Sequence, residues 1–500
     1  MSIFTESEWA QARLFGRLIF ANPFTEERTQ VEQRLLGRRH ITLYRVWHSV
    51  NGDLSVNKNL AGLNELCDDL VRKGLSRWQA EAASMNASER EAWDLLGLFW
   101  LFGKYSGPMC RNIYLEENAE AENARLYDAF LEDFRRIMQP PARAVPSPYM
   151  PDTIFALFHQ IHRAFNYIFD FIAGGSLAAG RLRAAIWQSI FTCDLIRYYL
   201  QLHDRMDEFT TLITGESGTG KELAARAIAF SQFIPFDATA HSFTHFYRNC
   251  FHPIQLSAMP QSLLESELFG HVRGAFTGAV EERHGYFEAC QPCESIFLDE
   301  IGDVSLETQV KLLRLLQTRQ FHRIGSTETL HFHGKVIAAT NADLAARCEA
   351  GAFRKDLLFR ICSDTIHTEP LRTLIDGKAE ELHQFVIVLA RRLMDEEHAA
   401  SFADRCCEWI VSHLGLDYAW PGNVRELEQC LRNLLLRGDY KPMLHSQNPA
   451  TASQFLENCT LTADELMRQY VAAMHRRLGN ASAVSRATGL DRRTVKKYLE

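Results

Sequence analysis

A glycine-rich loop near the middle of the chain is the feature that most restricts its possible fold. An apolar run, residues 209–214, leads into Gly215, Glu216, Ser217, Gly218, Thr219, Gly220 and Lys221, which fit the pattern G-x-x-x-x-G-K. Glycines let successive backbone N–H groups turn toward phosphate oxygens, and Lys221 brings a positive charge to the β- and γ-phosphates. A helical pattern follows, and its dipole adds to the attraction. This order predicts a nucleotide site; an accidental glycine-rich turn is the alternative.

One position of the loop departs from the usual pattern. A serine or threonine normally follows the lysine and binds the magnesium ion, whereas this chain has Glu222 there. Thr219 or a water molecule would have to supply that ligand instead.

Two further apolar runs end in polar side chains that suit ATP hydrolysis. Residues 295–299 form a predicted strand that ends in Asp299 and is followed by Glu300. Asp299 is placed to hold Mg²⁺ through water, and Glu300 to orient and deprotonate the attacking water. Residues 335–340 form another predicted strand, after which Asn341 could sense the γ-phosphate. Without the glycine-rich loop, the acidic pair would be interpreted as a solvated strand end.

The pattern of apolar residues changes along the chain, whose 500 residues are enough for two to four domains. Residues 1–171 look mainly helical, and Pro140, Pro141, Pro146, Pro148 and Pro151 predict a loop or linker there. Residues 172–372 alternate short apolar strands with helical patterns, which is typical of a parallel α/β sheet. The predicted strands are 209–214, 252–256, 295–299 and 335–340. Residues 373–440 are again helical, and residues 460–500 form a separate small unit.

Charge and cysteine content exclude several classes of protein. The net charge of -8 argues against a generally basic protein that coats nucleic acid. The 12 cysteines lack the spacing of a small secreted domain and indicate reduced thiols. Cys290 and Cys293 form one C-x-x-C pair, interpreted as two ordinary thiols because a metal site needs more ligands. With no signal peptide or membrane-spanning stretch predicted, the expected location is the cytoplasm.

Arg354 and Arg360 lie six residues apart, a spacing that does not place them well on one helical face. One of them could therefore point toward a neighbouring subunit and stabilise charge on its γ-phosphate. A surface arginine in an ion pair is the simpler alternative for either residue.

Residues 172–436 resemble the AAA+ domain of the sigma-54-dependent transcription activators, the bacterial enhancer-binding proteins. The resemblance rests on the phosphate loop, on residues 265–271 (ESELFGH), and above all on residues 274–279, which match the family's sigma-54-contacting loop. That loop consists of Gly274, Ala275, Phe276, Thr277, Gly278 and Ala279. Its glycines permit a change of shape with nucleotide state, and Phe276 and Thr277 present an apolar and a polar contact at its tip. Read alone, the segment would be a plain flexible loop.

The resemblance implies roles for other residues and an assembly. Arg354 and Arg360 become candidates for the arginine that acts in trans, and Arg425 in residues 420–427 becomes a second nucleotide sensor on a helical lid. The implied cofactors are ATP and Mg²⁺, and the implied assembly is a ring, usually a hexamer, with ATP sites between subunits. Gln255 stands where the family has an asparagine that couples the catalytic glutamate to the nucleotide. Residues 233–251, rich in histidine and aromatic residues, are an extra stretch.

The end of the chain predicts a DNA-binding helix-turn-helix. Residues 461–500 hold eight Arg/Lys against four Asp/Glu. Thr462 and Glu465 fit a capping box for one helix, Gly479 would end it, and Gly489 would make the turn before a basic helix. This pattern resembles the Fis-like element of many sigma-54 activators. Base contacts are expected from Arg492, Arg493 and Thr494, and phosphate contacts from Lys496 and Lys497. A solvated basic helix is the alternative.

Residues 1–171 are expected to receive the regulatory signal, since family members usually place a sensor there. They lack the strand-end aspartates of a phosphoacceptor receiver domain and suit a ligand-binding or a protein-interaction domain equally well. The leading interpretation is an ATP-driven activator of sigma-54 RNA polymerase that binds upstream DNA. The alternatives are a ring ATPase that remodels another protein, and a DNA-binding repressor with a degraded ATPase, suggested by Glu222 and Gln255.

Overall fold

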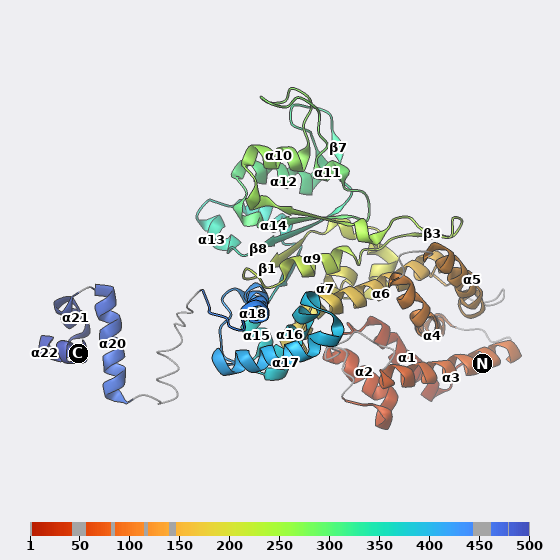
Figure 1. Ribbon diagram of the computed structural model, residues 1–500. Helices are drawn as coiled ribbons and strands as arrows, with labels where there is room; N and C mark the ends of the chain where they lie inside the picture. Colours follow the sequence, from red (N-terminus) through yellow and green to blue (C-terminus); the bar gives the residue numbers. More distant parts are fainter. Residues whose placement is uncertain are drawn as a thin grey trace. The chain divides into compact units, whose positions relative to one another are not determined.

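A five-stranded parallel sheet in the order β4-β5-β8-β1-β9 lies at the centre of the computed structural model (Figure 1). Its strands are β1 (Thr211–Thr214), β4 (Phe251–Gln255), β5 (Ser295–Asp299), β8 (Lys335–Thr340) and β9 (Asp364–His367). Four of them confirm the strands predicted from apolar runs, and β5 and β8 have the predicted bounds. Strand β9 was missed because alternating Asp, Thr, Ile and His give only one buried apolar side chain, Ile366.

The structure describes residues 3–42, 57–81, 86–114, 119–139, 147–443, 462–478 and 480–499. They divide into two compact units, residues 1–440 and residues 441–500. Pro140, Pro141, Pro146 and Gly479, to which the sequence assigned a linker and a helix end, lie outside the described residues. No helix among the described residues is both long enough and apolar enough to cross a membrane.

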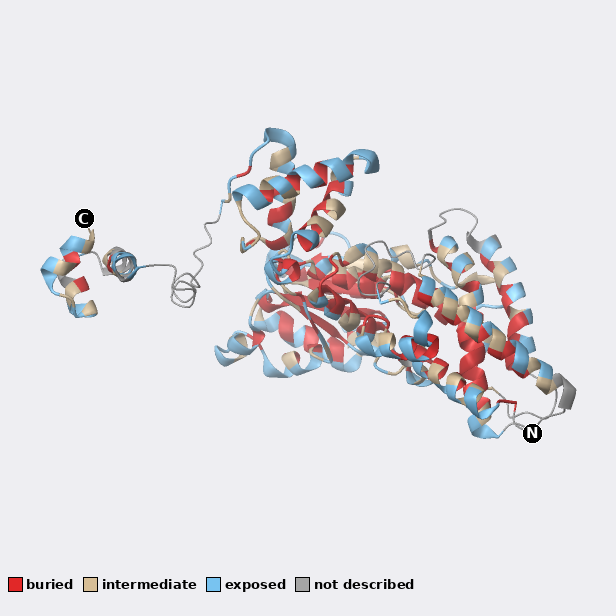
Figure 2. Cartoon of the chain, turned by 90° about the horizontal axis from the view of Figure 1, so that it is seen from below, coloured by how far each residue is buried: buried red, intermediate tan, exposed pale blue. Residues whose placement is uncertain are grey.

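Seven helices of 11 or more residues precede the sheet in the described part of the first unit, and the six that lie within residues 1–171 confirm the predicted helical character of that region. The seven are α1 (Glu6–Phe20), α2 (Glu26–Leu36), α3 (Lys58–Glu81), α4 (Ala87–Tyr114), α5 (Ala119–Met138), α6 (Pro151–Phe171) and α7 (Leu177–Phe191). Trp93 and Tyr105 are buried in their core. Apolar side chains of α6 and α7 share one cluster with Ile228 of α9 (Lys221–Ala229) and with Ile337 of β8. Figure 2 shows this buried region running from the N-terminal helices into the sheet.

The extra stretch at residues 233–251 joins the N-terminal helices to the sheet. It forms a small hairpin, β2 (Phe236–Asp237) with β3 (Ser242–Phe243). The Phe236 ring lies 4.7 Å from that of Tyr127 and 4.8 Å from that of Phe155. The hydroxyl of Tyr247 donates to the carbonyl of Ile113 at 2.6 Å. The aromatic residues of this extra stretch therefore form a surface that packs against α5 and α6.

One group of helices covers the face of the sheet opposite α9, and a second group forms a separate lid. The other face carries α10 (Gln261–Phe269), α11 (Tyr286–Ala289), α12 (Leu306–Thr318) and α14 (Lys355–Ile361) over a second core, and α13 (Leu344–Glu349) follows β8. The lid consists of α15 (Leu371–Ile375), α16 (Ala379–Leu393), α17 (Glu396–His413) and α18 (Asn423–Arg437) around a third core. A parallel sheet covered on both faces explains why its strands read as continuous apolar runs.

The second unit contains three described helices around a small core. They are α20 (Ala463–Leu478), α21 (Ala481–Thr488) and α22 (Arg492–Leu499), and Val471, Val484 and Val495 pack together between them. Thr462 and Glu465 form the two reciprocal hydrogen bonds of a capping box at the start of α20. Asp491 caps α22 by accepting from the backbone N–H groups of Arg493 and Thr494.

Candidate functional site

The phosphate loop connects the end of β1 to the start of α9. Gly215, Gly218 and Gly220 all have positive φ, which explains the three glycines. The ammonium group of Lys221 donates to the carbonyls of Gly215 at 3.0 Å and Glu216 at 3.2 Å, inside the curve of the loop. Burial lowers the pKa of Lys221, and the charges of Glu300 and Asp299 oppose that shift. The structure thus brings the predicted lysine and both predicted carboxylates together.

Hydrogen bonds of a threonine of the loop, one of them to a threonine directly after β9, stabilise the shape of the loop. The hydroxyl of Thr219 donates to the carbonyl of Glu216 at 2.8 Å and shares a hydrogen bond of 2.7 Å with the hydroxyl of Thr368. Since Thr219 already has two protein partners, a water molecule is the better replacement for the missing magnesium ligand. Glu222 forms an ion pair of 2.8 Å with Arg226, one turn along α9.

The acidic pair lies at the carboxyl end of β5. One carboxylate oxygen of Asp299 accepts from the backbone N–H of Glu300 at 3.0 Å, and the Glu300 carboxylate accepts from that of Asn341 at 3.3 Å. Glu300 has a φ of 57°, which turns the chain sharply after the strand. Burial, followed by the charge of Glu300, raises the pKa of Asp299. Half-buried carboxylate oxygens that repel each other suit a hard divalent cation, so Asp299 fits the predicted role of holding Mg²⁺.

Gln255 and Asn341 both lie beside the acidic pair, at the carboxyl ends of β4 and β8. Gln255 lies opposite Asp299 in the register of β4 and β5, and its side-chain amide donates to the hydroxyl of Ser257 at 3.1 Å. Asn341 reaches Glu300 through its backbone N–H. The contact that positions the Glu300 carboxylate is therefore a main-chain contact, which residue type alone does not reveal.

The N-terminal end of α18 closes over the phosphate loop. Asn423 donates to the carbonyl of Ser217 at 3.0 Å and to the Glu216 carboxylate at 3.1 Å, and Arg425 donates to the hydroxyl of Ser217 at 3.2 Å. Arg372 of α15 pairs with Glu216 at 2.5 Å. A cavity of ≈ 320 Å³ lies between Arg425 of the lid, the phosphate loop and the acidic pair.

Sequence reasoning found Arg425 but missed other residues that contact the phosphate loop or the cavity. Asn423, Thr368 and Arg372 make the contacts with the loop just described, and Arg392 lines the cavity. The only signal was that Asn423 belongs to the motif at residues 420–427. The others come from elements that approach the loop only in three dimensions.

Gly218 lets the lid lie close to the phosphate loop, and we expect an alanine at this position to weaken the packing of the lid on the loop. A Cβ at Gly218 would lie 2.5 Å from the carbonyl oxygen of Gly422, whereas a Cβ at Gly220 meets nothing closer than 3.9 Å. Both positions have positive φ and share that strain, so Gly220→Ala is the matched control. Without nucleotide, the thermal unfolding midpoint of Gly218→Ala should fall below that of Gly220→Ala, by the equivalent of about 1–3 kcal/mol of overpacking. Equal midpoints would contradict this packing.

Arg354 and Arg360 have different surroundings, although both are exposed. The guanidinium group of Arg354 pairs with Asp356 at 2.7 Å in front of α14. That of Arg360 donates twice to the carbonyl of Leu316, at 2.9 and 2.7 Å, near the end of α12. Between them Phe359 is 80% exposed. Arg354 is thus the freer of the two to reach another molecule.

Residues 274–279 form a tight loop that projects beyond α10, α11 and α12 at the top of Figure 1. The backbone N–H of Gly274 donates to the carbonyl of Ala279 at 2.9 Å and closes the loop. Its base is fixed by an ion pair of 2.7 Å between Glu267 and Arg283, and by a hydrogen bond of 2.7 Å between Ser266 and His271. These contacts make the segment ESELFGH (residues 265–271) the support of the loop.

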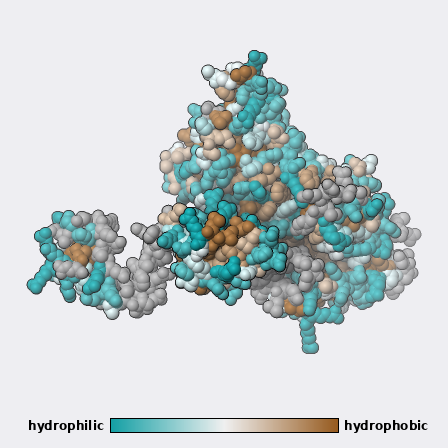
Figure 3. Space-filling model, in the orientation of Figure 1, coloured by the Kyte–Doolittle hydropathy of each residue, from teal (hydrophilic) through white to brown (hydrophobic). Residues whose placement is uncertain are grey.

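The tip of this loop is exposed and partly apolar. Phe276 is 44% exposed, Thr277 is exposed, and the neighbouring Val280 is 73% exposed. Figure 3 shows apolar surface at this end of the molecule. A second loop, between β6 (Gln320–Phe321) and β7 (Leu330–His331), lies against its base, where the backbone N–H of Val272 donates to the carbonyl of Ile324. No pattern in the sequence indicated this second loop.

Comparison with known proteins identifies the family of the central region. Residues 194–367 match the Sigma-54 interaction domain. The chain is 36% identical over 296 residues to the transcriptional regulatory protein ZraR of Klebsiella oxytoca, covering 57% of this chain and 62% of that protein. It is 43% identical over 223 residues to the Nif-specific regulatory protein of Azotobacter vinelandii, covering 44% and 38%. The chain thus spans less than two thirds of the length of these relatives.

A solved structure of NtrX from Brucella abortus in complex with ATP gives a TM-score of 0.41 at 20% identity, covering 90% of this chain and 97% of that chain. The family of the domain is assigned from the sequence matches, and the fold from the strand order of the sheet.

Proposed function

We propose that this chain, whose residues 194–367 belong to the Sigma-54 interaction domain family and form an AAA+ ATPase, activates transcription by sigma-54 RNA polymerase. The observation that carries the proposal is the exposed loop at residues 274–279, held on the same domain as the phosphate loop and the acidic pair. The loop offers an apolar ring at Phe276 and a hydroxyl at Thr277 to a protein partner. Since the proposed partners are DNA and RNA polymerase, the proposed location is the cytoplasm.

ATP and Mg²⁺ are the proposed cofactors of the site. The backbone of residues 215–220 and Lys221 would bind the phosphates, Asp299 would hold Mg²⁺, and the ion would neutralise charge on the β- and γ-phosphates. Glu300 would take the proton of the attacking water, since its carboxylate is held in place by the backbone N–H of Asn341. Arg425 and Asn423 would report the state of the nucleotide to the lid.

A ring of subunits, with six members as the family suggests, is the proposed assembly. The exposed ring of Phe359 and the solvent-facing Arg354 lie on the same short helix and its cap, which supports a subunit contact there. An arginine delivered across that contact would make hydrolysis depend on assembly. The division of the chain into a regulatory region 1–171, an ATPase with its lid and a DNA-binding unit 460–500 belongs to the same proposal.

Helix α22 is the proposed DNA-recognition helix, and two of its residues should behave differently on DNA. Arg492, Arg493, Lys496 and Lys497 are exposed, whereas the Thr494 hydroxyl donates to the Asp491 carboxylate at 2.6 Å. Arg493→Ala should cost about 1–3 kcal/mol and relax sequence preference at one position. Lys497→Ala should weaken binding to all sequences alike and lower the salt slope by about 1. Selection from random DNA followed by salt titration measures both, and unchanged binding by both variants would contradict a recognition role for α22.

Promoter opening in a purified system tests the whole proposal. Full-length protein, sigma-54 RNA polymerase and DNA carrying a sigma-54 promoter are combined with ATP or with a non-hydrolysable analogue. Opening should require both this protein and hydrolysable ATP. If ATP is hydrolysed while promoters of this class stay closed, the alternative of an ATPase that remodels another protein replaces the proposal.

A further inference from the structure

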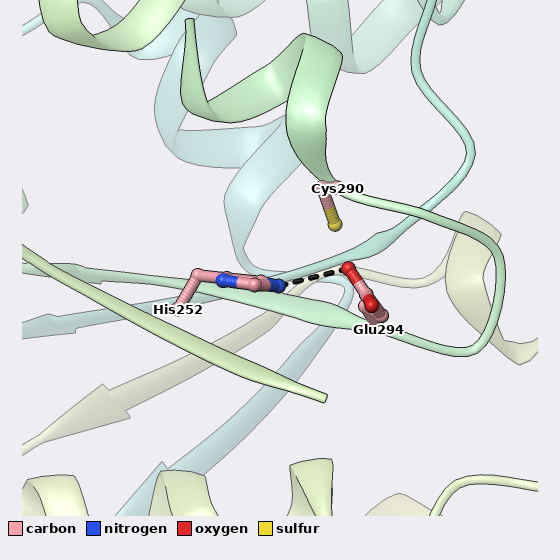
Figure 4. Close-up of side chains that lie close together, drawn as sticks. All are labelled: His252, Cys290 and Glu294. Carbon is pink, nitrogen blue, oxygen red and sulfur yellow. Dashed lines mark hydrogen bonds and ion pairs between the residues drawn. The ribbon is translucent and has the colours of Figure 1, made fainter. Parts of the chain in front are cut away.

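Three side chains with metal-binding groups converge at the amino ends of β4 and β5. They are His252 in β4, Cys290 directly after α11, and Glu294 directly before β5; their ligand atoms all lie within 4.8 Å of one another. Figure 4 shows the imidazole, the thiol and the carboxylate pointing toward a common point. Nε2 of His252 lies 2.8 Å from Oε2 of Glu294. Cys290, one member of the C-x-x-C pair, thus gains two neighbouring ligand groups from the fold, whereas the sequence alone offered none.

This cluster is distinct from the nucleotide site. In the parallel register of β4 and β5, Phe251 lies opposite Ser295 and Gln255 opposite Asp299. The cluster and the acidic pair are therefore at opposite ends of the same two strands, and Glu294 and Asp299 are about 17 Å apart along the chain at the usual rise per residue. A cation bound at one site would not occupy the other.

The protein surrounds the sulfur of Cys290 closely. A Cβ added to Gly334 would come within 2.3 Å of Sγ, so only glycine leaves room for the sulfur there. Burial, followed by the charge of Glu294, raises the pKa of the Cys290 thiol, and Arg319 opposes the shift. A divalent cation at this point would favour the thiolate and relieve the repulsion between sulfur and carboxylate. Cys293, the other member of the C-x-x-C pair, is not part of the cluster.

We propose that His252, Cys290 and Glu294 bind one zinc-like divalent cation, with water as the fourth ligand. Imidazole, thiolate and carboxylate with one open position are ligands that Zn²⁺ accepts. Tetrahedral ligands lie about 3.5 Å from one another, which small side-chain rotations can reach from the present spread. The bound ion would tie the end of α11, which follows the projecting loop in the chain, to the edge strand β4 and its neighbour β5. This site rests on the side-chain geometry alone and does not depend on the proposed function.

Cobalt binding to the full-length protein tests the site. After treatment with a chelator, the protein is titrated with Co²⁺, and the thiolate-to-cobalt charge-transfer absorption is followed. One Co²⁺ per chain should produce this absorption, and Zn²⁺ should displace it. Cobalt held by the Asp299 carboxylate would not produce it, because that site has no sulfur ligand.

Three variants make the test decisive. Cys290→Ser should abolish the absorption, whereas the matched control Cys293→Ser should retain it at the same stoichiometry. His252→Gln keeps the thiol and should weaken Co²⁺ binding by more than about tenfold, since even outer partners of a metal ligand are worth that much. Circular dichroism checks that each variant is folded. No absorption in the unaltered protein, retention in Cys290→Ser, or its loss in folded Cys293→Ser would overturn the proposal.

Discussion

Replacing Lys221 with alanine is expected to abolish nucleotide binding and to reduce ATP hydrolysis by on the order of 10³-fold or more. The Lys221 ammonium group is the cation that lies inside the phosphate loop, where it donates to the carbonyls of Gly215 and Glu216. An alanine would leave the phosphate charges without that partner in a partly buried site. Binding of a fluorescent ATP analogue and release of phosphate measure the two effects.

Lys378→Ala is the matched control for this experiment. Lys378 is exposed and pairs only with Asp376 at the surface of the lid, at 2.7 Å. Its loss should leave both measurements unchanged. Hydrolysis by Lys221→Ala at the rate of the unaltered protein would show that the loop is not the site of the reaction.

Replacing Thr277 with alanine is expected to separate hydrolysis from promoter opening. Thr277 lies at the exposed tip of the projecting loop and makes no contact with the phosphate loop or the acidic pair in the described hydrogen bonds, so ATP hydrolysis should stay intact. Promoter opening should fall by roughly 30-fold or more, the effect of losing a central contact worth about 2 kcal/mol. Phosphate release and run-off transcription, measured on the same samples, check both halves.

Val280→Ala is the control for that variant. Val280 is 73% exposed and directly follows the loop, so the substitution removes apolar surface near the loop without altering its tip. Promoter opening should remain close to that of the unaltered protein. Unchanged transcription with Thr277→Ala would show that promoter opening does not need the Thr277 contact of the loop. An equal loss of transcription in both variants would indicate a general defect.

The predicted fold depended on features that are continuous in the sequence. Buried parallel strands read as apolar runs, and the phosphate loop has a fixed spacing, so β1, β4, β5 and β8 were found with errors of at most two residues at either end. Strand β9 carries a single buried apolar residue and could not be found in this way. Thr368, which follows it, was missed for the same reason, although its hydroxyl supports Thr219.

The boundary predicted at residue 171 shows that a change in the pattern of apolar residues does not mark the end of an independently packed unit. Helix α6 ends at Phe171, where the helical texture stops, yet its side chains pack on α9 and on the hairpin at residues 236–243. Removing residues 1–171 would expose the apolar surfaces of α7, α9 and the hairpin that α6 covers. Helices α6, α7 and α9 share one core, so the N-terminal helices are packed directly on the helix that begins at Lys221.

Candidate site residues were predictable where a motif fixes both residue type and spacing, as for Lys221, Asp299 and Glu300. They were not predictable where a contact crosses between elements, as between Asn423 of the lid and Ser217 of the loop. The cluster of His252, Cys290 and Glu294 is of the second kind, because strand pairing alone brings His252 beside the other two.

Capture of sigma-54 by the purified full-length protein, in the presence of an ATP transition-state analogue, tests the central claim most directly. The unaltered protein should retain sigma-54 with the analogue and release it without nucleotide, whereas Phe276→Ala should not retain it. Equal capture by Phe276→Ala, or no capture by an unaltered protein that hydrolyses ATP, would contradict a loop that transmits the work of hydrolysis to sigma-54.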